Sequence, residues 1–151
     1  MTGIVLYGST SLAQQFNSGF SSDTNSIIEE FNSFFKNEIR RQGVKGNWIF
    51  ELNEITGIHK FDYNNDGFID SFLEFNAVPE EGGGVTLYFG VLFENRKDKL
   101  ISYIDYLKLD EMSFSAFEQG RFNFVLKDGY SNPDKKVSIQ IKDNKFATLD
   151  D

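Results

Sequence analysis

Residues 71–93, SFLEFNAVPEEGGGVTLYFGVLF, decide how the chain folds. Between Leu73 and Ala77 apolar and polar side chains alternate, and this period of two predicts a strand. Residues 85–93 form an almost unbroken apolar run, which predicts a strand in the centre of a sheet. Pro79 and the glycines at 82–84 place a turn between the two segments. So short a connection favours antiparallel pairing, because a parallel crossover needs a dozen or more residues.

Shorter strand signals continue on both sides of this hairpin. Alternating or apolar segments of strand length lie at 48–53, 58–61, 100–108, 121–126, 137–141 and 145–149. Turn residues such as Asp143 and Asn144 separate several of these segments. The connection at 110–119 has no regular strand period, and the spacing of Phe114 and Phe117 hints at a helical turn there.

An amphipathic helix precedes the strands. Its apolar residues recur at spacings of three and four, and they are Ile27, Ile28, Phe31, Phe34, Phe35 and Ile39. We expect this stripe to pack on one face of the sheet. The predicted fold class is therefore α+β, with one N-terminal amphipathic helix packed on a curved antiparallel sheet of about six to seven strands.

The length of 151 residues predicts one domain, because domains usually contain about 100–200 residues. We expect a single α+β domain at 23–151. Residues 1–22 are expected to be a flexible N-terminal segment or the remnant of a signal sequence. Ser11 and Ala13 are the small residues that a signal peptidase requires, whereas the usual positively charged start is missing. Both interpretations stay open.

Composition excludes several classes of function. Without cysteine there is no thiol nucleophile, disulfide or thiolate metal site. The single histidine, His59, excludes zinc sites built on histidine pairs, and its alternation with Ile58 predicts an exposed strand position. The net charge of -8 argues against sequence-independent binding to nucleic acid. No apolar run approaches the ~20 residues of a membrane-spanning helix.

Acidic residues are concentrated between residues 51 and 81. This segment contains eight acidic residues and one lysine, so its formal charge of -7 is nearly that of the whole chain, -8. So dense a cluster repels itself unless it is spread in water or matched by a cation. At its centre, residues 62–70 read DYNNDGFID.

This D-x-N-x-D-G-x-x-D pattern resembles the calcium loops of EF-hand-like proteins, in which oxygen ligands at alternate positions surround one ion and a glycine permits a sharp turn. The resemblance implies five ligands, which are the side chains of Asp62, Asn64, Asp66 and Asp70 and the backbone carbonyl of Phe68. It also implies that Ile69 packs inward and ties the loop to the core.

The match departs from an EF-hand at two points. Leu73 stands at position twelve, where an EF-hand has a bidentate glutamate, and the flanks read as strands. The loop is therefore more similar to the strand–loop–strand calcium loops of FG-GAP and integrin-like repeats and of small exported bacterial proteins. Without the glutamate we expect weak binding, in the ~10⁻⁴–10⁻³ M range of extracellular modules. The alternative is a metal-free turn, because Asn, Asp and Gly all favour turns.

These features lead to one expected function and two alternatives. We expect a small exported protein that is not an enzyme, carries one calcium ion in the 62–70 loop, and has a structural role or binds a protein or glycan partner. Its expected location is the periplasm, the cell surface or the exterior, with the cytoplasm left open. The first alternative is an acidic inhibitor or immunity-type protein that covers a basic surface. The second is a hydrolase that uses a carboxylate pair among Glu51, Glu54 and Glu74.

Overall fold

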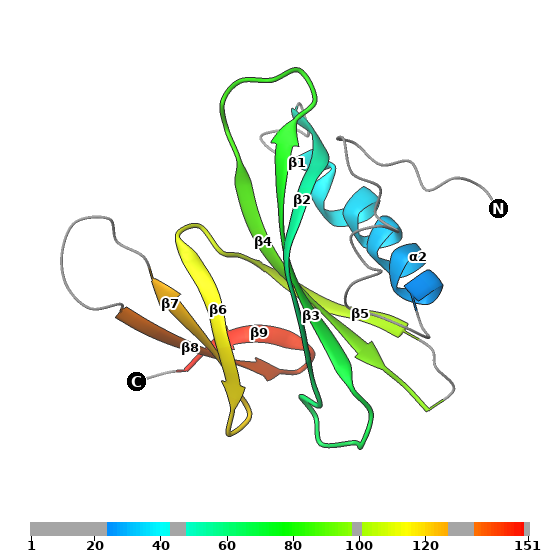
Figure 1. Ribbon diagram of the computed structural model, residues 1–151, viewed down its shortest axis with the longest axis vertical. Coiled ribbons are helices and arrows are strands. Elements are labelled where there is room, and N and C mark those ends of the chain that lie inside the picture. Colours follow the sequence, from blue (N-terminus) through cyan, green and yellow to red (C-terminus); the bar gives the residue numbers. More distant parts are fainter. Residues whose placement is uncertain (1–23, 43–47, 98–100, 127–134, 150–151) are drawn as a thin grey trace.

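The computed structural model describes residues 24–42, 48–97, 101–126 and 135–149, and these residues form three layers (Figure 1). The first layer is a helix, α2 Thr24–Phe34, which continues into one π-helical turn, η1 Phe35–Ile39. The second layer is a sheet of β1 Arg41–Gln42, β2 Trp48–Phe61, β3 Asp70–Pro79, β4 Leu87–Asn95 and β5 Ile101–Lys108. The third is a sheet of β6 Met112–Glu118, β7 Arg121–Leu126, β8 Lys135–Lys142 and β9 Lys145–Thr148.

Both sheets are antiparallel meanders, in which each strand pairs with the next strand along the chain. The first sheet lies between the helix and the second sheet (Figure 1). Its strands β3 and β4 therefore bury side chains on both faces. This explains the apolar run at residues 89–93 of β4, whereas β3 also buries the polar residues Asp70, Ser71 and Asn76.

One core lies between the helix and the first sheet. The apolar stripe of α2 and η1 packs on Leu73 and Phe75 of β3 and on neighbouring residues of β2, β4 and β5. Aromatic rings supply much of this contact: Phe31 meets Phe75 edge to face with ring centroids 5.2 Å apart, and Phe34 lies 5.0 Å from Tyr103. The helix predicted from its three- and four-residue spacing thus buries the predicted face.

A second core lies between the two sheets. Phe72 of β3 is fully buried there and contacts Phe114 of β6, Phe122 and Phe124 of β7, with ring centroids 5.2, 5.6 and 5.9 Å away. Gly90 of β4 lies directly beneath the Phe72 ring, because a Cβ at this position would overlap with that ring. A strand that separates two cores therefore presents alternate residues to each of them.

The predictions of an α+β fold and of a helix packed on an antiparallel sheet are confirmed. The strands are divided between two facing sheets, whereas the sequence predicted one curved sheet. The predicted segments 48–53 and 58–61 are parts of the single long strand β2, whose pairing with β3 contains two register shifts. The helical turn expected within 110–119 was wrong, because these residues form β6.

The predicted N-terminal segment at 1–22 lies outside the described residues. Within the ranges that are described, no helix is long and apolar enough to cross a membrane.

Candidate metal centre

The acidic loop joins the end of β2 to the start of β3, as the sequence predicted. Two of its residues have positive φ angles, 63° at Asn65 and 88° at Gly67. Asparagine and glycine tolerate this left-handed conformation better than other residues do. The positions of these two residues let the chain reverse within the loop.

Side-chain oxygens inside the loop hold the backbone in place. Both oxygens of Asp62 accept backbone N–H groups, from Asp66 at 3.1 Å and from Gly67 at 2.8 Å. Asn64 also accepts the Asp66 N–H, at 3.2 Å, and Asp66 accepts the Phe68 N–H at 2.8 Å. The loop therefore curls around its own carboxylates.

Asp70 is the buried member of the group, with 0% of its surface exposed. Its two oxygens accept backbone N–H groups from Tyr63 at 3.0 Å and from Asn95 at 2.8 Å. The pKa of this carboxyl is raised to about 6, chiefly by burial and also by the nearby charges of Asp66 and Asp62, while the two backbone donors act in the opposite direction. The site thus holds a carboxylate that water does not solvate.

Three of the five predicted ligands come together. One carboxylate oxygen from each of Asp62, Asp66 and Asp70 lies within 4.8 Å of the other two, and this group could hold a metal ion. The side-chain oxygen of Asn64 belongs to the same turn through its bond to Asp66. Ligation by the Phe68 carbonyl stays a prediction.

The expected inward packing of Ile69 was wrong. Its side chain is 54% exposed, because the chain enters β3 at Asp70 and it is Asp70 that points into the protein. The anchor between loop and core is therefore a hydrogen-bonded carboxylate rather than an apolar side chain.

One residue near Asp70 was not predicted, and it lies on β4. Within the part of the chain that the structure describes, the side-chain oxygen of Asn95 is buried without a hydrogen-bond partner. The backbone N–H of Asn95 binds Asp70, which is 25 residues away along the chain. Only the pairing of β3 with β4 brings the two together, so no local sequence signal identifies Asn95.

The glutamates of the hydrolase alternative have separate surroundings. Glu74 is held by two contacts: its Oε2 lies 2.9 Å from His59 Nε2, and its Oε1 accepts the Phe114 N–H at 2.7 Å. Glu54 is exposed, and Glu51 is half-buried. The predicted exposed position of His59 was wrong, because its ring is half-buried with its centroid 4.4 Å from that of Phe114.

No family model, curated protein or solved structure matches this chain. The function is therefore inferred from the geometry of the loop and its surroundings.

Proposed function

We propose that this chain is a small exported binding or structural protein, without enzymatic activity, whose 62–70 loop carries one structural calcium ion. One observation carries the proposal: three carboxylate groups, one of them fully buried, converge within 4.8 Å in a curled loop. Like charges at this separation repel one another, and a divalent cation would remove the repulsion.

The hydrogen bonds inside the loop leave some carboxylate lone pairs free to coordinate an ion. A carboxylate has about four lone-pair positions on its two oxygens, and the backbone N–H groups use only some of those on Asp62, Asp66 and Asp70. Asn95, whose backbone N–H binds Asp70, also carries a buried side-chain oxygen without a described hydrogen-bond partner. These donors fit a hard cation that binds six to eight oxygens.

The donor set favours calcium over other metals. Among the described residues, the candidate ligand group consists of three aspartates and contains no histidine. Zinc and copper are therefore disfavoured, because both metals prefer nitrogen or sulfur ligands. Leu73, at position twelve, is fully buried in the core beneath the helix, so no bidentate glutamate closes the loop. Binding should therefore fall in the ~10⁻⁴–10⁻³ M range, which suits a calcium-rich exterior.

The ion would act by binding the folded chain and not the unfolded chain. With a Kd of about 10⁻⁴–10⁻³ M, about 10 mM calcium should raise the free energy of unfolding by about 1.4–2.7 kcal/mol. The ion would join the end of β2 to the start of β3, and this role requires no catalytic group.

Thermal and urea unfolding in EDTA, in calcium and in magnesium test the proposal. We expect a calcium-specific rise in the midpoint that Asp66→Asn abolishes. The control is Asp110→Asn, which alters an exposed aspartate in the turn between β5 and β6 and should keep the full calcium response. An unchanged midpoint in every condition would reduce the loop to a metal-free turn. The acidic surface would then favour the inhibitor alternative, which capture of a basic partner at low salt would test.

A further inference from the structure

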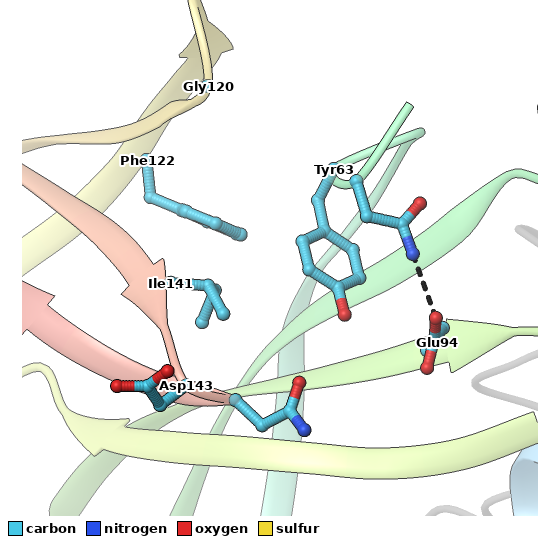
Figure 2. A pocket seen from close by; sticks show the side chains of 8 residues that line it. Tyr63, Glu94, Gly120, Phe122, Ile141 and Asp143 are labelled. Carbon is cyan, nitrogen blue, oxygen red and sulfur yellow. Dashed lines mark hydrogen bonds between the residues drawn. The ribbon is translucent and has the colours of Figure 1, made fainter. Parts of the chain in front are cut away.

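A pocket of about 380 Å³ lies beside the acidic loop, where turns from both sheets meet (Figure 2). The 62–69 loop contributes Tyr63 and Asn64, and the turns β6–β7 and β8–β9 contribute Gly120 and Asn144. All three turns lie in the lower half of the molecule in Figure 1. The volume is within the range of small-molecule sites, about 300–1,000 Å³.

One part of the pocket is apolar. Phe122 of β7 and Ile141 of β8 line it from the second sheet, and Tyr63 lines it from the loop. Figure 2 shows the Phe122 ring extending toward Tyr63, whose phenol oxygen points into the space between Ile141 and Glu94. The pocket therefore offers ring surfaces together with a hydroxyl group.

The rest of the pocket mixes hydrogen-bond donors and acceptors. Its lining includes the residues Asn64, Asn144, Glu94 and Asp143, although Figure 2 shows the Asp143 carboxylate turned away from Tyr63 and Glu94. Glu94 is fixed by two bonds, from Asn64 Nδ2 at 2.8 Å and from Arg96 Nε at 3.2 Å. Carboxylates only accept hydrogen bonds, whereas amides donate and accept them.

This lining selects one class of ligand. An anion is disfavoured, because the described lining residues include the Glu94 carboxylate and no basic side chain. An amine is disfavoured too, because both oxygens of Glu94 already accept hydrogen bonds, from Asn64 and Arg96, and the Asn144 amide N–H groups would gain no acceptor. A neutral, hydroxyl-rich ring donates to carboxylates, accepts from amides and lays its C–H face on aromatic and aliphatic side chains.

We infer that this pocket binds a sugar ring of a neutral glycan. The inference rests on the proposed binding role and names its ligand, but it does not require calcium in the loop. The two sites share a wall, since Tyr63 lines the pocket while its backbone N–H is bound by Asp70. An ion in the loop would hold this wall in place, so calcium should tighten sugar binding.

Titration of the ¹⁵N-labelled chain with cellobiose, maltose, lactose and chitobiose tests the inference. Each sugar is raised to about 20 mM, well above the 1 mM Kd of a weak site. We expect at least one of the four to shift the amide signals of Asn64, Gly120 and Asn144. Spermidine and glucose 6-phosphate, which represent amines and anions, should not produce these shifts. The inference is overturned if no sugar shifts these amides, or if spermidine alone does.

Two variants and one change of conditions sharpen the test. Glu94→Gln keeps an acceptor for Asn64 but loses the charge, and it should weaken sugar binding about tenfold. Glu111→Gln alters an exposed residue in the β5–β6 turn and should leave binding unchanged; equal effects of the two variants would overturn the inference.

Repeating the titration in EDTA separates the two proposals. If a sugar shifts the amide signals but calcium does not raise the unfolding midpoint, only the metal site is refuted. If calcium raises the midpoint but no sugar shifts the signals, only the sugar site is refuted.

Discussion

Glu74 of β3 accepts the backbone N–H of Phe114 of β6 at 2.7 Å, and this bond joins the two sheets. Its other oxygen lies 2.9 Å from His59 Nε2 on β2. Asp105 of β5 makes a second such bond, accepting the Phe146 N–H of β9 at 2.8 Å. Because β6 and β9 are the edges of the second sheet, each edge donates a backbone N–H to a carboxylate of the first sheet.

Glu74→Ala should lower the free energy of unfolding by about 2–4 kcal/mol, because it removes two half-buried hydrogen bonds and leaves the Phe114 N–H without its acceptor. Urea unfolding measures the change. Glu54→Ala, at an exposed site on β2, is the matched control and should change stability by less than about 0.5 kcal/mol. Similar losses in the two variants would contradict a joining role for Glu74.

Asp105→Ala should free the edge strand β9 without unfolding the protein. Loss of the acceptor leaves the Phe146 N–H exposed to local opening. We expect the hydrogen-exchange rate of this amide to rise about tenfold or more, while amides of β7 keep their rates. Asp105→Asn retains one oxygen and should show a smaller increase. Equal acceleration in β7 and β9 would indicate global destabilisation instead.

Gly90→Ala should destabilise the chain by about 1–3 kcal/mol, because the new methyl group would overlap with the buried ring of Phe72. Combining it with Phe72→Leu removes the outer ring atoms that meet the methyl group. The double variant should therefore be more stable than the sum of the two single losses predicts. Additive losses, measured by urea unfolding, would show that the ring is not the obstacle.

Asp70 should make the metal-free protein less stable as the pH rises. Its folded pKa of about 6 lies above the ordinary 3.8, so between these values the folded chain keeps a proton that the unfolded chain has lost. The stability contributed by this proton is complete below about 3.8 and is lost as the pH rises through 6, by at most about 3 kcal/mol. Unfolding in EDTA from pH 4 to 7 should show this slope relative to Asp70→Asn, and parallel curves would contradict it.

Ile69→Ser should change the free energy of unfolding by less than about 0.5 kcal/mol, because this side chain is mostly exposed. Leu73→Ala, four residues later in the same hairpin, should cost about 2–5 kcal/mol because Leu73 is fully buried. A loss near 2 kcal/mol at Ile69 would restore the inward position that calcium loops of the EF-hand type imply.

Strand periods and the helical stripe were sufficient to predict the helix and every described strand except β1 and β6, and β7 has the bounds that were expected. The division into two sheets was not predictable, because a turn between β5 and β6 has the same sequence character whether or not the strands pair. The misleading spacing of Phe114 and Phe117 has a physical cause. A bulge between Phe114 and Ala116 inserts one residue, so both rings face the core between the sheets although they are three residues apart.

The acidic loop was predictable because its carboxylates are close in the sequence. Asp62, Asp66 and Asp70 lie in one turn whose glycine and asparagines mark it. Asn95 and the pocket were not predictable, because they depend on the pairing of β3 with β4 and on the contact between the sheets. A site whose residues are close in the sequence could therefore be predicted, whereas a site assembled from distant segments could be found only in the folded structure.

The position of the first sheet between two cores has a consequence for synthesis on the ribosome. The helix precedes this sheet in the chain, so the face that carries Phe75 can be covered as soon as β5 has emerged. The opposite face, with Phe72 and Leu92, stays bare until residues 112–148 have been made. A nascent chain that pauses after β5 would expose this apolar face, which makes it prone to aggregate and a substrate for chaperones.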